Sequence, residues 1–168
     1  MKEATIVKEY EMKCKEHILT PPKFPFEIHE FQGYIYNDYL NLQYYNEDIN
    51  GIFKITVSPV QNKLAFYVHK GAKFYSLKNN IKALYNPHFD SAYELLFQKN
   101  GFQYTIAIGN KRYIQEKYNV KDLIQIAESM NLKTIFSIWE RSFFIILYSK
   151  LSSMIAIILR CFKTFNII

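Results

Sequence analysis

Residues 93–130 constrain the fold more than any other stretch of the chain, because they have the pattern of a hairpin followed by a capped helix. Apolar side chains recur at every second position in Tyr93–Phe97 and again in Phe102–Ile108, as half-buried strands require. Between these strands lies Asn100-Gly101, and both residue types tolerate the positive φ of a type I′ turn. The two strands are therefore predicted to be antiparallel partners.

An amphipathic helix is predicted after the hairpin. Asn119 is placed to cap its start, and Asp122 follows three residues later, near the positive end of the helix dipole. The spacing i, i+3, i+4, i+7 puts four apolar side chains on one face: Leu123, Ile126, Ala127 and Met130. The opposite face carries Lys121, Asp122, Gln125, Glu128 and Ser129. Such a helix is expected to pack flat on a sheet.

Short apolar runs separated by turn residues predict more strands upstream. These runs are Phe31–Tyr36, Tyr39–Tyr45, Ile52–Val57, Leu64–Val68, Lys73–Leu77 and Ile81–Tyr85. Their spacing indicates an antiparallel meander with strands of about five to six residues. The predicted fold class is α+β, with an antiparallel, curved sheet of about six strands, one amphipathic helix packed on it and an apolar C-terminal tail.

Three segments are predicted along the 168 residues. Residues 1–20 form a charged N-terminal segment in which a short surface helix, with Ile6, Val7, Tyr10 and Cys14 on one face, ends before Pro21-Pro22. Residues 21–131 form a single α+β domain, large enough to bury a core without disulfides. Residues 132–168 form an apolar, basic tail.

The tail leaves three interpretations open. Phe143–Leu159 contains only one charge, Lys150, and is near the lower length limit for crossing a bilayer. Basic residues lie on both sides of this run, so the positive-inside rule gives no orientation. A membrane span, a helix on a membrane surface or a partner, and a buried or accidental terminal extension all remain candidates.

The net charge of +6 does not by itself indicate a nucleic-acid-binding protein. From Leu132 onward there are five basic residues and one acidic residue, a net charge of +4, which leaves +2 for the first 131 residues. No basic run interleaved with aromatic residues and no RNA-binding signature occurs. We expect a solvated surface of mixed charge and no specific nucleic-acid binding.

Catalytic and metal-binding motifs are not found. The histidines are scattered at His17, His29, His69 and His88, and Cys14 and Cys161 belong to no CxxC pattern. The sequence contains no GxSxG elbow, no phosphate-binding glycine loop and no GxGxxG. We therefore predict no catalytic, cofactor-binding or metal-binding residue and no cofactor. We also expect no N-terminal signal peptide, because the first 20 residues lack an apolar core.

Two sets of residues are weaker candidates for a site. His88 and Asp90 could form a small polar site on a loop, or an ordinary surface pair. Tyr34, Tyr36 and Tyr44 could line an apolar ligand groove, or serve as core and rim aromatics of the sheet.

Three stretches carry a resemblance to a known family: Ala83-Leu84-Tyr85, then Leu95-Leu96-Phe97 to Gly101 and Tyr104, then Leu123–Met130. With weaker similarity back to about Pro21, this pattern resembles an uncharacterised bacterial domain family. That family is found at the extracytoplasmic C-terminal end of lipoproteins and anti-sigma-type membrane proteins of low-GC Gram-positive bacteria. The resemblance implies an α+β sensing or binding module that acts outside the membrane, with no catalytic residues.

The chain departs from the family pattern at both ends. We expect no N-terminal anchor, and an apolar tail follows the helix at which the family domain usually stops. These departures leave the location open between the cell envelope and another association with a membrane.

Two functional classes follow, and a third, weaker possibility is a membrane-tethered protein whose tail is its only functional part. The first is a non-enzymatic sensing or binding module of a bacterial cell-envelope or regulatory system, holding an apolar ligand or a protein partner against the sheet and contacting a membrane surface through the tail. The second is a small hydrolase or transferase that works through His88, Asp90 or another pair. The absence of a clustered acid, base or nucleophile favours the first class, whereas strongly shifted titration of His88 would favour the second.

Overall fold

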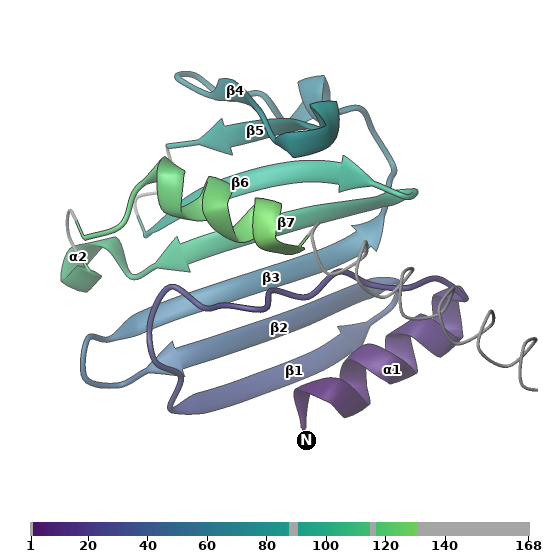
Figure 1. Cartoon of the computed structure of the whole chain (residues 1–168), viewed down its shortest axis with the longest axis horizontal. Helices are drawn as coiled ribbons and strands as arrows, with labels where there is room; N and C mark the ends of the chain where they lie inside the picture. Colours follow the sequence, from purple (N-terminus) through teal and green to yellow (C-terminus); the bar gives the residue numbers. More distant parts are fainter. Residues whose placement is uncertain (1, 88–90, 115–116, 131–168) are drawn as a thin grey trace, which may run out of the picture. The chain divides into compact units, whose positions relative to one another are not determined.

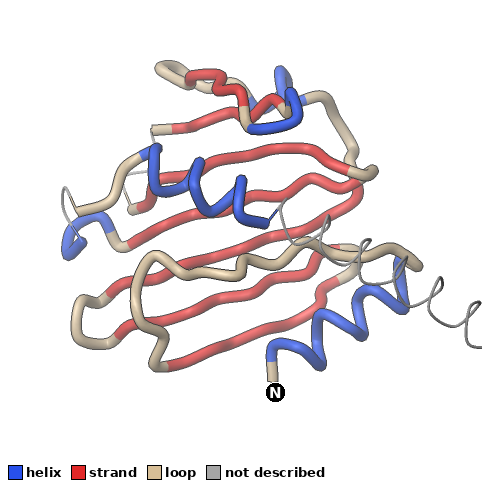
Figure 2. Tube along the Cα trace, in the orientation of Figure 1, coloured by secondary structure: helices blue, strands red, loops and turns tan. Residues whose placement is uncertain are grey.

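A computed structural model describes residues 2–87, 91–114 and 117–130. All of these residues belong to the first of two units into which the chain divides, Met1–Met130 and Asn131–Ile168. The tail predicted at 132–168 and the pair His88 and Asp90 lie outside the described residues. The described unit is an α+β fold built on one open antiparallel sheet, as predicted (Figures 1 and 2).

The sheet has seven strands, against the expectation of about six. They are β1 (Glu30–Tyr36), β2 (Tyr39–Asn46), β3 (Gly51–Pro59), β4 (Lys73–Ser76), β5 (Lys82–Asn86), β6 (Ala92–Lys99) and β7 (Phe102–Gly109). The helices are α1 (Glu3–Cys14), the short α2 (Lys111–Ile114), two 3₁₀ turns, η1 (Leu64–Tyr67) and η2 (Lys78–Asn80), and a helix over 120–130.

The strand order is β1-β2-β3-β7-β6-β5-β4, so the prediction of a single meander is wrong between β3 and β4. Two meanders, β1 to β3 and β4 to β7, join where β3 pairs with β7 (Figure 1). Both of these strands alternate fully buried apolar residues with half-buried ones. Strands with such a deeply buried face are most stable in the middle of the sheet, where both edges are paired.

The turn between β6 and β7 confirms the predicted hairpin. Lys99 and Phe102 are partners across it, so the loop contains only two residues. Asn100 has φ 51° and Gly101 has φ 78°, the positive values that a type I′ turn demands at both positions.

The prediction of a strand at 64–68 is wrong, because these residues lie in the connector 60–72 and form η1. The connector leads from the middle of the sheet to its far edge, and η1 contacts β6 on the way. A hydrogen bond holds the connector to β6: the Gln98 side-chain amide donates to the Asn62 carbonyl at 2.6 Å. No strand of the described sheet pairs with this apolar run, and its backbone takes the tighter local hydrogen bonds of a 3₁₀ turn.

Side chains alternate between two faces of the sheet, which we call the inner face and the outer face. The inner face carries the core, including Leu42, Phe53, Ile55, Leu95, Phe97, Tyr104 and Ile106. In Figure 1, α1, the segment 18–28 and the 120–130 helix all lie over this same face. The outer face is the opposite one, and the connector 60–72 lies over its β5–β6 part, where Leu84 and Leu96 are buried.

The N-terminal helix α1 is packed on the sheet. Ile6 and Tyr10 are buried and belong to the core, and the Tyr10 hydroxyl donates to the Asp38 carbonyl at 2.6 Å. Residues 2–20, predicted as a segment apart from the 21–131 domain, therefore lie in the same described unit as the sheet.

The 120–130 helix matches its sequence pattern. The Lys121 amide donates to Asn119 Oδ1 at 2.8 Å, and the Asn119 amide donates to Asp122 Oδ2 at 2.7 Å, which is a reciprocal cap. All four residues predicted for the packed face are buried: Leu123, Ile126, Ala127 and Met130.

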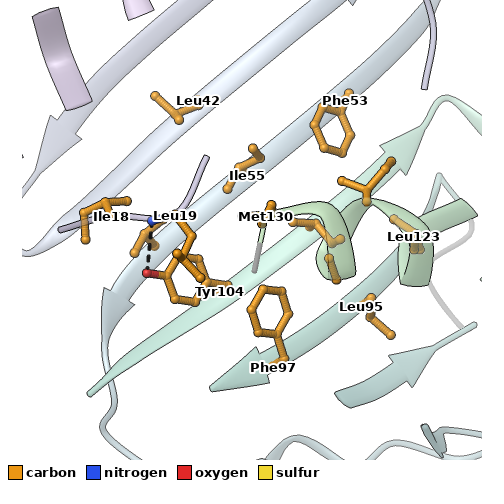
Figure 3. Close-up of a cluster of buried hydrophobic side chains, with 14 of the residues drawn as sticks. Ile18, Leu19, Leu42, Phe53, Ile55, Leu95, Phe97, Tyr104, Leu123 and Met130 are labelled. Atoms are coloured by element: carbon orange, nitrogen blue, oxygen red, sulfur yellow. Dashed lines mark hydrogen bonds between the residues drawn. The ribbon is translucent and has the colours of Figure 1, made fainter. Parts of the chain in front are cut away.

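The close-up of the core shows how the inner-face elements meet. Leu123 and Met130 lie on the same side of the sheet as Leu95 and Phe97 (Figure 3). The dashed line marks the Leu19 amide, which donates to the Tyr104 hydroxyl at 3.4 Å. Fully burying a side chain such as that of Leu123 contributes about 1.5–3 kcal/mol to stability.

In the described ranges, no helix has the length and hydrophobicity needed to cross a membrane.

Candidate functional site

The three tyrosines predicted to line one groove do not come together. Tyr34 and Tyr36 lie on the outer face of β1, with 47% and 67% of their surface exposed, whereas Tyr44 is 1% exposed in the core. Tyr44 is the cross-strand partner of Phe31, an odd-numbered residue of β1, so it must point away from Tyr34 and Tyr36. Its ring packs on Phe24 at 4.6 Å. Tyr44 is thus a core residue, and the predicted groove is not formed by these three.

The two exposed tyrosines belong to a larger open surface on β1, β2, β3 and β7. We call it the polar-aromatic face. Its tyrosines, amides and hydroxyls are Gln32, Tyr34, Tyr36, Tyr39, Asn41, Gln43, Tyr45, Thr56, Ser58, Gln103 and Thr105, of which Asn41 and Ser58 are buried. Among the outward positions of these four strands, only Glu30 and Lys54 are charged. The surface is therefore nearly neutral, although the whole chain contains 36 charged residues, 21 basic and 15 acidic.

Tyrosines gather at one corner of this face. Tyr36 and Tyr39 are partners across the β1–β2 hairpin, and Tyr34 is the next residue of β1 on the same side. Tyr39 is 37% exposed. Rings of this kind present an apolar surface and a hydroxyl together, which suits contact with another molecule.

Hydrogen bonds between side chains fix much of the face. The Thr56 hydroxyl donates to Asn41 Oδ1 at 3.1 Å, and the Tyr45 hydroxyl donates to Gln43 Oε1 at 2.5 Å. Near the β7 side, the Gln98 amide donates to Gln103 Oε1 at 3.2 Å. Groups held in this way lose less conformational freedom when a ligand arrives.

A second polar group on the outer face could not be recognised in the sequence. Glu94 of β6 is the cross-strand partner of Asn86 of β5. Burial raises the pKa of the Glu94 carboxyl, while a hydrogen bond from Asn86 and the nearby His69 and Lys54 act in the opposite direction. A carboxyl of raised pKa beside a histidine is an arrangement found in acid–base sites and also in structural networks.

Asn86 ties this group to the connector. Its amide donates to the Tyr67 carbonyl at 3.4 Å, whereas its Oδ1 is buried without a hydrogen-bond partner in the described chain. Sequence patterns place Asn86 and Glu94 near one loop. They do not indicate His69 or Lys54, because only the β3–β7 pairing and the path of the connector bring these residues to the same region.

The described residues contain no cluster of three or more His, Cys, Asp or Glu side chains that could hold a metal ion. Comparison of the chain with protein-family models, characterised proteins and solved structures found no match.

Proposed function

We propose that the protein is a non-enzymatic binding module whose contact surface for a protein partner is the polar-aromatic face. The observation that supports this most is an open, nearly neutral sheet face with exposed Tyr34 and Tyr36 at its corner. The centres of protein interfaces are depleted of charge and enriched in tyrosine. A sheet face that served only to meet water would be expected to carry more of the chain's charged residues.

The system in which the module acts is proposed from the sequence pattern. The family resemblance carried by 83–85, 95–104 and 123–130 supports a sensing or binding role in a bacterial cell-envelope or regulatory system. In that setting the core on the inner face stabilises the fold, and the polar-aromatic face is available for contact with the partner.

Site-specific photocross-linking in the native cell tests the proposal. A photoreactive phenylalanine analogue at Tyr34 is expected to trap one defined partner, which the same analogue at the exposed Tyr113 of α2 should not trap. With that partner purified, the double variant Tyr34→Ala and Tyr36→Ala should weaken binding by about 30-fold or more, as for loss of a 2 kcal/mol hot spot. Equal trapping from both positions, or unchanged affinity of the double variant, would show that this face is not the contact surface.

A small hydrolase or transferase is the second candidate, favoured by the Glu94 carboxyl with its raised pKa beside His69. Glu94→Gln separates the two proposals, because it should abolish an activity based on this carboxyl and leave partner binding at Tyr34 unchanged. If the protein shows hydrolase or transferase activity and Glu94→Gln removes that activity while the fold stays intact, the enzyme proposal is supported.

A further inference from the structure

A pocket lies on the other side of the sheet, between residues 23–25 and the 120–130 helix. Its volume is about 240 Å³. The helix contributes Asp122, Gln125, Ile126 and Ser129, whose spacing i, i+3, i+4, i+7 places them on a single stripe. The sequence pattern assigns three of these residues, the polar ones, to a solvated face. In the structure these three residues border a pocket next to the buried face of the helix, and Gln125 is exposed.

The apolar walls of the pocket are held in place from behind. Phe24 packs its ring on Tyr44 at 4.6 Å and on Phe53 at 6.1 Å, so it is supported by the core. Tyr118, which also lines the pocket, meets the Phe26 ring edge-on at 6.0 Å. Walls fixed by packing favour binding, because little freedom is lost when a ring enters.

The size of the pocket suits one ring with a short substituent. An apolar cavity of about 150 Å³ is sufficient for benzene, so a pocket of about 240 Å³ leaves room for a few more atoms. The aromatic and aliphatic walls formed by Phe24, Tyr118 and Ile126 match a planar ring.

The two charged residues of the pocket, Lys23 and Asp122, differ in the contacts that they already make within the protein. Asp122 accepts the Asn119 amide at 2.7 Å in the first turn of the helix, where the helix dipole also stabilises a negative charge. Lys23 makes no ion pair with any residue that the structure describes. Burial and the negative charge of Asp122 together raise the pKa of Tyr118 in the same pocket. The Lys23 ammonium is nevertheless available to pair with an anionic substituent on the ligand.

From these observations we propose that the pocket binds an aromatic carboxylate, with the ring between Phe24 and Tyr118 and the carboxylate paired with Lys23. The Gln125 amide offers a further hydrogen bond at the rim. The same chemistry is present in a free aromatic acid and in the C-terminal aromatic residue of a peptide. This site is independent of the polar-aromatic face, because it lies across the sheet from it.

The test uses the full chain, labelled with ¹⁵N, and three small probes. Phenylacetate is expected to shift the amide signals of Lys23, Phe24 and 118–129, with a weaker response to the neutral benzyl alcohol and none to the phenylethylammonium cation. Lys23→Gln should weaken phenylacetate binding about threefold to fivefold, the loss of one solvent-exposed ion pair, and leave benzyl alcohol unaffected. The matched control Lys63→Gln, at an exposed connector lysine, should change neither.

A second pair of probes identifies the source of the ligand. The affinities of the peptide Gly-Gly-Phe with a free C-terminal carboxylate and of its C-terminal amide are measured alongside that of phenylacetate. Tighter binding of the free peptide than of phenylacetate would support the aromatic-carboxylate site and assign it to a peptide terminus, whereas tighter binding of phenylacetate would support the site and assign it to a small acid.

Three outcomes would overturn the proposal: no shifts of the Lys23, Phe24 and 118–129 amides with any carboxylate probe at about 10 mM, preference for the cation, or unchanged phenylacetate affinity in Lys23→Gln. Failure of this test leaves the photocross-linking result at Tyr34 unaffected, so the two proposals fail separately.

Discussion

Replacing Gly101 with valine should destabilise the protein by a backbone effect alone. A Cβ built at this position meets no atom within 4 Å, so the new side chain has space and no clash contributes. The remaining effect is the φ of +78°, a left-handed conformation that disfavours L-residues by about 1–2 kcal/mol. Valine should be at the upper end of this range, because a β-branched side chain resists positive φ most strongly.

Urea denaturation followed by far-UV circular dichroism measures this loss. With a denaturant slope of about 1.5–2 kcal/mol per M for a domain of this size, the midpoint should fall by about 1 M. Gly101→Asn is the matched control. Its midpoint should fall much less, since asparagine tolerates this region and Asn100 already has φ 51° in the same turn. Equal midpoints for the valine variant and the natural chain would refute the assignment of a strained two-residue turn.

Three further predictions follow from burial, titration and charge. Leu123→Ala should lower the free energy of unfolding by about 3 kcal/mol, because Leu123 is fully buried between helix and sheet; a loss below about 1 kcal/mol in urea would contradict that packing. The raised pKa of Glu94 means that its ionisation opposes folding, so stability is lost as pH rises above the ordinary value of 4.5. Glu94→Gln should therefore raise the melting temperature more at pH 7 than at pH 4, and an equal effect at both would refute this. A chain ending at Met130 should melt cooperatively but no longer sediment with anionic vesicles as the full chain should, because 132–168 carry +4; a truncated chain that fails to fold would place the tail in the core.

The elements predicted well from the sequence are those whose signals are local. The turn at Asn100-Gly101 and the cap at Asn119 need only a few neighbouring residues, and both occur as expected. The buried face of the 120–130 helix also follows from its own spacing. Such signals depend on backbone preferences that act before any distant contact is made.

Other features depend on contacts between distant residues. The pairing of β3 with β7 is one of them, since a period of two shows that each strand has a buried face but not which strand lies beside it. The apolar run at 64–68 could not be distinguished from a strand. It covers part of the outer face of the sheet, and this contact depends on the path of the whole connector 60–72, which a local pattern does not show. Without the β1–β2 register, the face on which Tyr44 lies could not be predicted either. The same limit applies to the candidate sites, where Asn86, Glu94 and His69 approach one another through the topology.

The order of the strands also determines how the chain can reach its folded state. Each meander is made of neighbours in sequence, whereas Ile55 and Ile106 become partners only after the intervening chain has closed into a loop. Local pairs form quickly and distant ones slowly, because loop closure reduces entropy before any contact is gained. We therefore expect β1–β3 and β4–β7 to form first as two half-sheets, with their docking along β3 and β7 as the slow step. Stopped-flow refolding should show it as hydrogen-exchange protection that appears later for the amides joining β3 to β7 than for those within the β2–β3 and β6–β7 pairs, and simultaneous protection of both sets would argue against this order.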